Sequence, residues 1–150
     1  METQFHLRAR AVISHNGKFL LARAKGKVKS NTFLPGGHIE LGESIVTTLE
    51  REAIEEFGRD VVVKEYLGAI EHSFGENPKH FEINHVFHVE ILDLVKNPEV
   101  HSLEDHEEFM WVSPDEFEEY NLQPFPLREL IRRRTAGDVS IWWASTFYRN

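Results

Sequence analysis

Apolar and polar residues alternate over residues 5–9 and give way to a continuous apolar run at residues 11–13. Alternation with a period of two is typical of a β-strand, and the continuous run is typical of a strand that enters a core. Asn16-Gly17 follows, a dipeptide that favours a two-residue hairpin turn. The apolar segment 19–23 supplies the returning strand. The chain is therefore predicted to begin with a β-hairpin.

Residues 44–57 instead follow a helical period. Their apolar stripe comprises Val46, Leu49, Ala53 and Phe57. Ser44 is a suitable N-cap, and Gly58 can end the helix in the left-handed conformation. The pattern predicts a helix whose apolar stripe packs on a sheet.

Two β-rich segments, 61–74 and 81–92, are joined by the turn-forming sequence GENPKH and predict a long hairpin. Residues 107–113 predict a further short strand. A helix is expected to begin at Ser113-Pro114-Asp115 and to include the sequence DEFEEY, because proline suits the first helical position.

The segment 126–134 predicts a last helix, and the aromatic tail that follows it has no clear pattern. The predicted order is hairpin, helix, hairpin, strand, helix. This order indicates an α/β (α+β) sandwich with a mixed sheet, not a doubly wound parallel sheet. No linker or repeat interrupts the chain, so residues 1–150 are expected to form a single domain.

Composition narrows the function classes. The 150 residues carry a formal net charge of −8 and contain no cysteine. A strongly acidic chain is a poor ligand for duplex nucleic acid, and the absence of cysteine excludes disulfides and thiolate metal sites. The first residues lack the apolar run of a signal peptide, and no apolar run has the ~20 residues of a membrane helix. We expect a cytoplasmic protein with neither nucleic-acid duplex nor membrane as partner.

Charge along the predicted helix is unusual. Glu52, Glu55 and Glu56 share one stripe beside the apolar one. Like charges three and four residues apart repel by roughly 0.2–0.5 kcal/mol per pair. A solvated acidic face would explain such a cluster on its own. Alternatively, carboxylates at the edge of a packed face are the oxygen ligands that Mg²⁺ or Mn²⁺ prefers.

The residues around this cluster favour the second interpretation. Gly37, Glu43 and the segment from Arg51 to Arg59 follow the pattern G-x5-E-x7-R-E-U-x-E-E-x-G-U, where U is aliphatic. The chain thereby resembles the Nudix hydrolase family. Every charged and glycine position matches. The last aliphatic position is occupied by Arg59, and Val61 is the next aliphatic residue, so the departure concerns packing and not the candidate ligands.

The resemblance implies a Nudix-type α/β/α sandwich with a mixed sheet and its catalytic helix at about Ser44 to Phe57. It also implies a hydrolase that cleaves a nucleoside diphosphate linked to another group, using Mg²⁺ or Mn²⁺. Glu52, Glu55 and Glu56 would be catalytic metal ligands, with Glu52 the favoured residue to orient or deprotonate water. The backbone carbonyl of Gly36 would be a further ligand.

The same resemblance assigns supporting roles. Arg51 and Glu43 would form an ion pair that holds the helix against the preceding loop. Apart from the resemblance, the chemistry requires a cationic side chain that stabilises charge on the leaving phosphate. Arg23, at the end of the second strand, is the candidate, with Lys25 and Lys27 behind it or merely solvated. In similar enzymes, a downstream carboxylate completes the metal site or acts as the base, and the same is expected here.

For that carboxylate, the sequence offers Glu104, Asp105 and Glu108, and the spacing from Trp111 favours Asp105. The aromatic residues of the tail could stack on a base, cover the sheet or form a dimer contact. A homodimer is therefore possible.

Within this family, particular substrates are marked by extra residues downstream of the motif, and none of these marks is clearly present here. The group linked to the nucleoside diphosphate is therefore left open, and the substrate is expected to be a small nucleotide such as a nucleoside triphosphate. Two alternatives remain: hydrolysis of RNA 5′ ends, and a catalytically silent module that senses nucleotides or binds a partner. The short basic loop argues against a long RNA track, and the intact set of three glutamates argues against a silent module.

Overall fold

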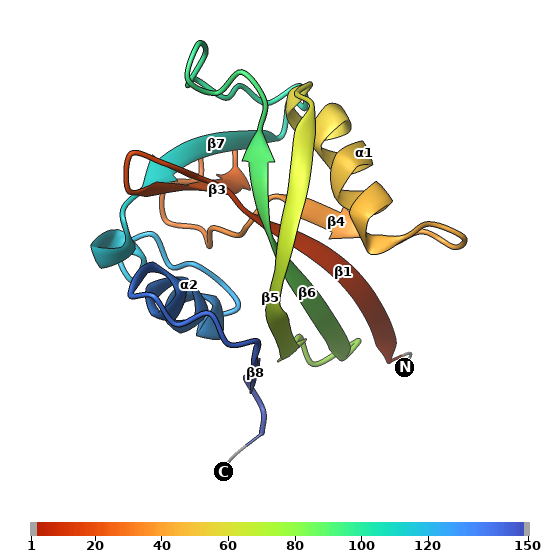
Figure 1. Cartoon of the computed structure of the whole chain (residues 1–150). Helices are drawn as coiled ribbons and strands as arrows, with labels where there is room; N and C mark the ends of the chain where they lie inside the picture. Colours follow the sequence, from red (N-terminus) through yellow and green to blue (C-terminus); the bar gives the residue numbers. More distant parts are fainter. Residues whose placement is uncertain (1–2, 149–150) are drawn as a thin grey trace.

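The computed structural model describes residues 3–148. Eleven elements follow one another along this part of the chain (Figure 1). They are β1 (Gln4–Val12), β2 (Ser14–His15), β3 (Lys18–Ala24), β4 (Gly36–His38), α1 (Ile45–Phe57), β5 (Val61–Phe74), β6 (His80–Ile91), β7 (Glu107–Val112), the 3₁₀ turn η1 (Pro114–Glu116), α2 (Pro126–Thr135) and β8 (Trp142–Ser145).

Two sheets form from these strands. The larger has the order β4-β1-β6-β5-β8, and the smaller has the order β2-β3-β7. Strands β1 and β6 run parallel, as do β5 and β8, whereas β4 and β1 and the long β5–β6 hairpin are antiparallel. The larger sheet is therefore mixed, and the predicted fold class is confirmed.

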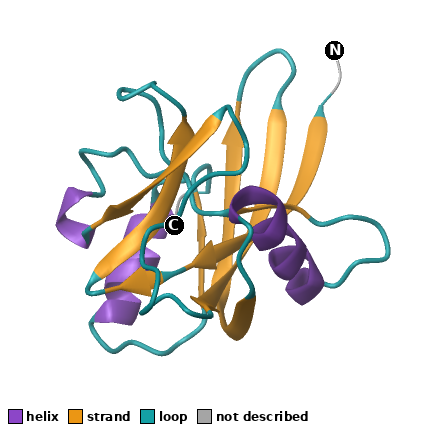
Figure 2. Cartoon of the chain, turned by 90° about the horizontal axis from the view of Figure 1, so that it is seen from above, coloured by secondary structure: helices purple, strands orange, loops and turns teal. Residues whose placement is uncertain are grey.

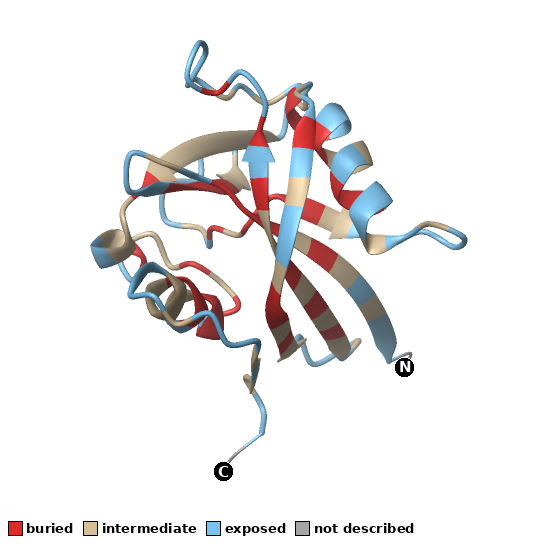
Figure 3. Cartoon of the chain, viewed as in Figure 1, coloured by how far each residue is buried: buried red, intermediate tan, exposed pale blue. Residues whose placement is uncertain are grey.

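The helices α1 and α2 lie on opposite sides of the strands (Figure 2). One hydrophobic cluster joins α1 to the sheet through Leu49, Ala53 and Phe57. A second cluster joins α2 to the other side through Leu127 and other buried residues. Burial is accordingly concentrated on the helix sides that contact strands, and the outer side of α1 is exposed (Figure 3).

Strand β1 shows how one sheet supplies both a core and a site. Ala9 and Ala11 belong to the cluster beneath α1. Arg8 and Arg10 alternate with them, and successive side chains of a strand point to opposite faces. The two arginines therefore lie on the face opposite α1, where α2 covers only the part near Val12.

Helix α1 begins and ends as the sequence predicts. The Ser44 hydroxyl accepts a hydrogen bond from the Thr47 backbone N–H at 3.0 Å. Gly58 ends the helix with φ 66° and donates its N–H to the Ile54 carbonyl. The expected apolar stripe is correct except at Val46, which is 43% exposed.

Other expectations need correction. The helix predicted through DEFEEY is only the short turn η1, since its end is tied to other loops: Tyr120 accepts a hydrogen bond from Thr32. The strands β4 and β8 were not predicted. Within residues 3–148, no helix combines the length and apolar character needed to cross a bilayer.

Candidate functional site

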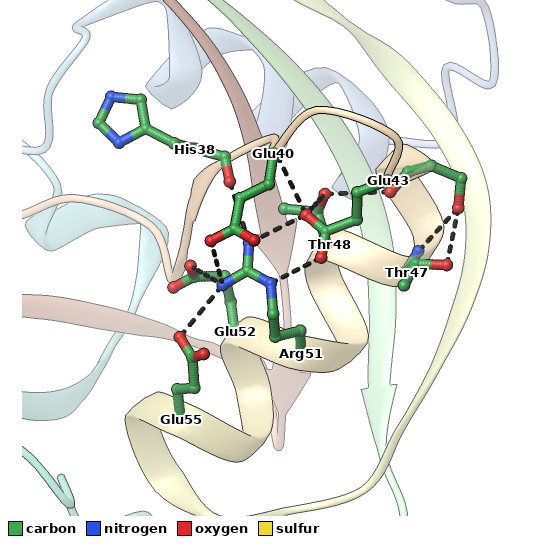
Figure 4. Close-up of polar contacts among 9 residues, drawn as sticks. His38, Glu40, Glu43, Thr47, Thr48, Arg51, Glu52 and Glu55 are labelled. Atoms are coloured by element: carbon green, nitrogen blue, oxygen red, sulfur yellow. Dashed lines mark hydrogen bonds and ion pairs between the residues drawn. The ribbon is translucent and has the colours of Figure 1, made fainter.

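Arg51 is the centre of a hydrogen-bond network on one side of α1 (Figure 4). Its Nε donates to Glu43 Oε2 at 2.6 Å, and its Nη2 donates to Glu43 Oε1 at 3.0 Å. Its Nη1 donates to Glu52 Oε1 at 2.8 Å and to Glu55 Oε2 at 3.1 Å. The His38 carbonyl accepts a further bond from Nη2 at 3.1 Å. One guanidinium thus ties α1 to the loop that precedes it.

This network explains how two of the three clustered glutamates are tolerated. The hydrogen bonds from Arg51, followed by one from Thr48, lower the pKa of Glu43 to about 2. In return, the Glu43 carboxylate raises the pKa of Arg51. Because the guanidinium is shared, its charge also offsets those of Glu52 and Glu55.

Glu56 faces a different environment. Its side chain is buried and accepts a hydrogen bond from the Gly36 backbone N–H at 3.3 Å. Burial, followed by the charges of Glu107 and Glu52, raises the pKa of Glu56 to about 9. Burial also raises the pKa of Glu52. These carboxyl groups are held where negative charge is costly unless a cation is nearby.

Two glycines make room for this arrangement. Gly36 has φ 134°, and a Cβ there would lie 2.0 Å from the Ala9 carbonyl oxygen. A Cβ on Gly37 would lie 2.6 Å from the Glu52 carboxyl carbon. A side chain at either position would displace β4 or Glu52. The carbonyl of Gly36 as a metal ligand stays a prediction.

Glu107, from β7, joins Glu56 and Gly36 at one corner of the site, the carboxylate corner. Glu107 lies beside Glu56 in the lining of a shared cavity, and burial, followed by the charge of Glu104, raises the pKa of Glu107. Its Oε1 is buried and has no hydrogen-bond partner among residues 3–148. Glu104, His106 and Glu107 also offer ligand atoms that lie within 4.8 Å of one another.

Asp105, the carboxylate that the spacing favours, is exposed and does not line this cavity. The side chain that reaches the corner is instead Glu107, the first residue of β7. The sequence signal for it was weak, because the loop before β7 contains several acidic residues and nothing in the spacing shows which side chains turn inward.

The donor set fits a hard divalent cation. The buried carboxyl of Glu56, the partly buried carboxyl of Glu52 and the unpartnered oxygen of Glu107 are oxygen donors whose pKa values remain raised although Arg51 and Arg10 lie nearby. Mg²⁺ and Mn²⁺ favour such ligands. Glu55 is more peripheral: its side chain is 54% exposed and is paired with Arg51.

Beyond this corner lies a cavity of about 460 Å³, a size typical of small-molecule sites. At one end, it is lined by Gly36, Glu56 and Glu107. Its floor is the sheet face opposite α1. The residues of this floor are Arg8, Arg10 and Glu82, and none of the three was predicted from the sequence. Only the parallel pairing of β1 with β6 brings them together, and that register leaves no local sequence signal.

Arg23 does not line the cavity. Its Nε donates to Glu108 Oε1 at 2.7 Å, and its guanidinium lies 6.0 Å from the centre of the Tyr120 ring. Its predicted role toward substrate stays a prediction. Lys25 and Lys27 are exposed on the following loop.

The aromatic tail is divided between two environments. Trp142 packs against the core and lies 5.4 Å from the Arg133 guanidinium. Trp143 and Tyr148 are at least half exposed and contact each other edge to face. Trp142 therefore packs on the body of the protein, in agreement with the expectation that the aromatic tail covers the sheet.

Comparison with known proteins agrees with this geometry. The family model of the NUDIX domain matches residues 5–133. The chain belongs to the NUDIX family. This NUDIX hydrolase is 31% identical to the CTP pyrophosphohydrolase of Escherichia coli (strain K12) over 126 residues, which cover 79% of this chain and 85% of that protein.

Solved structures show the same NUDIX fold. The solution structure of the E. coli ORF135 protein has 27% identity and a TM-score of 0.66, covering 92% of this chain and 96% of that one. A NUDIX hydrolase from Nitrosomonas europaea has a TM-score of 0.70 and covers 92% and 93% of the two chains. Its 21% identity supports the fold alone. The protein is therefore a hydrolase of a family that acts on nucleoside diphosphate derivatives.

Proposed function

We propose that this NUDIX hydrolase converts a nucleoside triphosphate to the nucleoside monophosphate and pyrophosphate in the presence of Mg²⁺ or Mn²⁺. The observation that carries the proposal is the corner formed by Glu56, Glu107 and Gly36, which opens into a cavity large enough for a nucleotide. The triphosphate class is supported by the likeness to a CTP pyrophosphohydrolase.

Glu52, Glu56 and Glu107 would hold the cation, with Glu55 at the periphery. When bound, the divalent ion neutralises phosphate oxygens and lowers the pKa of water. Glu107 takes the place that the sequence assigned to Asp105, because its unpartnered oxygen is buried at the corner.

The remaining chemistry belongs to the side chains. A water oxygen forms a bond to phosphorus, the bridging P–O bond breaks, and its electron pair leaves with the pyrophosphate. Glu52 Oε1 accepts a hydrogen bond from Arg51, which leaves Oε2 to take the proton from the attacking water.

The test is product analysis after incubating the full chain with Mg²⁺ and separate nucleotides. The panel contains the four nucleoside triphosphates, ADP-ribose, nucleotide sugars, dinucleoside polyphosphates and triphosphorylated RNA. We expect monophosphate and pyrophosphate from at least one triphosphate. Turnover in ¹⁸O-labelled water then shows which phosphorus is attacked, since the label enters only that product.

Two variants of the same helix sharpen the test. Glu56→Gln removes a proposed ligand with little change in shape and should lower kcat by at least about 100-fold. Glu50→Gln makes the same change at an exposed position of α1 and should leave the rate unchanged. Equal rates for the two variants, or hydrolysis confined to RNA or nucleotide sugars, would overturn the proposal.

A further inference from the structure

Arg8 and Glu82 form an ion pair on the floor of the cavity, away from the carboxylate corner. Arg8 Nε lies 3.1 Å from Glu82 Oε2, and the two side chains are 19% and 8% exposed. They come from the adjacent parallel strands β1 and β6, in which Arg8 is opposite Asn84. Neither residue has a part in holding the cation or in the hydrolysis described above.

The pair is poorly satisfied by the protein itself. Arg8 Nε is buried, and its N–H direction does not suit a hydrogen bond to Glu82 or to any other group in residues 3–148. Burial of an ion pair is costly unless further hydrogen bonds satisfy it. Both side chains retain some exposure, 19% for Arg8 and 8% for Glu82, and both line the cavity, so a ligand there can hydrogen-bond to the exposed part of the guanidinium and of the carboxylate.

Two aromatic rings line the same cavity. Phe74 and Phe33 both contribute to its wall. The Phe74 ring is stacked on His80, with ring centres 4.6 Å apart and planes 3° apart, so its orientation is fixed. Aromatic side chains that flank a polar recognition point favour a planar ligand such as a nucleobase.

The spacing along β1 agrees with a nucleotide. Gly36, at the corner, is opposite Arg10 in the β1–β4 pair. Arg8 is two residues further along β1, which corresponds to roughly 7 Å. A ribose separates the phosphate of a nucleotide from its base by a distance of this order, so phosphates at the corner place the base near Arg8 and Glu82.

We propose that Arg8 and Glu82 recognise the base of the substrate and select cytosine over uracil. This inference rests on the proposed function. The Glu82 carboxylate accepts a hydrogen bond from the 4-amino group of cytosine, and the Arg8 guanidinium donates to N3 or O2. Uracil presents a carbonyl oxygen in place of the amino group, and that oxygen is repelled by the carboxylate of Glu82.

The experiment measures kcat/KM for CTP and for UTP with Mg²⁺. Wild-type protein should prefer CTP. Glu82→Gln supplies an amide that can both donate and accept, and it should lower the CTP-to-UTP ratio by about tenfold or more. Any loss of active protein lowers kcat/KM for both substrates by the same factor and so leaves the ratio unchanged. Glu90→Gln is the matched control, since it removes an exposed carboxylate of the same strand that is paired with Lys64, and should leave the ratio unchanged.

A second variant applies if Glu82→Gln does not fold. Glu82→Asp keeps the charge but withdraws the carboxylate by one methylene, and it should reduce kcat/KM for CTP more than for UTP. An unchanged ratio in the folded variants, or no preference for CTP in the wild type, overturns base selection while leaving triphosphate hydrolysis intact. A wild type that hydrolyses no triphosphate overturns both proposals.

Discussion

At the residue scale, the closeness of Glu56 and Glu107 carries the chemistry. Glu56 is buried, one oxygen of Glu107 is buried, and desolvation is the main cause of the rise in each pKa. Each carboxylate makes the ionisation of the other less favourable. A divalent cation between them would remove that penalty. The oxygen of Glu107 that lacks a partner within residues 3–148 has the same implication.

Glu107→Gln should therefore lower kcat/KM by about 100-fold and weaken Mg²⁺ binding, because the amide is neutral and a poor ligand. Asp105→Asn should stay close to wild type, since Asp105 is exposed and outside the cavity lining. The measurement is the rate of nucleotide hydrolysis against Mg²⁺ concentration for both variants. A severe loss of activity in Asp105→Asn, with little change in Glu107→Gln, would show that Asp105 and not Glu107 is the downstream carboxylate.

The residues of the site differ in how well they could be predicted from the sequence. Glu52 and Glu56 follow from a local spacing, because a helix brings residues three and four apart to one face. Arg8 and Glu82 are 74 residues apart in the chain and meet only through the register of β1 and β6. That register depends on packing of the whole sheet, so no local pattern could identify the floor of the cavity.

At the scale of elements, Arg51 is the connection between α1 and the loop from His38 to Glu43. Its bonds to Glu43 and to the His38 carbonyl anchor the loop, and its bond to Glu52 orients a proposed ligand (Figure 4). A planar guanidinium can hold several acceptors in fixed directions, which an ammonium group cannot do.

Arg51→Lys keeps the charge but loses this geometry. We expect a fall of about 10–100-fold in activity at limiting Mg²⁺, the range found when groups that orient metal ligands are removed. Arg132→Lys is the control, because Arg132 also binds a glutamate, Glu118, through two nitrogen atoms but on α2. Equal effects of the two substitutions on the Mg²⁺ dependence would show that Arg51 does not orient a ligand.

Some elements were less predictable than α1. The caps of α1 are local, so Ser44 and Gly58 mark its ends in the sequence. Strand β4 is only Gly36–His38 and pairs with β1, whereas β8 joins the far edge beside β5. Glycines have low strand propensity, and short edge strands form because a neighbouring strand is available. Such pairings cannot be inferred from local composition.

At the scale of the whole molecule, each side of the strands has a hydrophobic cluster, and the polar site occupies the part of one face that α2 leaves uncovered. One face packs against α1, and the other is covered by α2 only in part, which leaves the cavity. The buried carboxyl groups at the edge of this cavity affect stability as well as function. Their influence must depend on pH, because their raised pKa values apply only to the folded chain.

For Glu56, the sign follows from its pKa of about 9 in the folded protein against 4.5 for an ordinary glutamate. Between these values, the folded state retains a proton that the unfolded state has lost. The contribution of this group to stability is therefore fully present below pH 4.5 and is lost as pH rises toward 9. In EDTA, the free energy of unfolding should fall by up to about 1.4 kcal/mol per pH unit from this group alone.

The difference between wild type and Glu56→Gln isolates that contribution, since all other titrating groups are shared. Urea unfolding at pH 5, 6.5 and 8 in EDTA should show the wild type losing stability relative to the variant as pH rises. Mg²⁺ binds the ionised carboxylates, so its stabilisation of the wild type should grow with pH by mass action, and Glu56→Gln should gain much less. Parallel pH profiles for the two proteins, with equal gains from Mg²⁺, would mean that Glu56 is neither buried as a neutral acid nor a ligand of the cation.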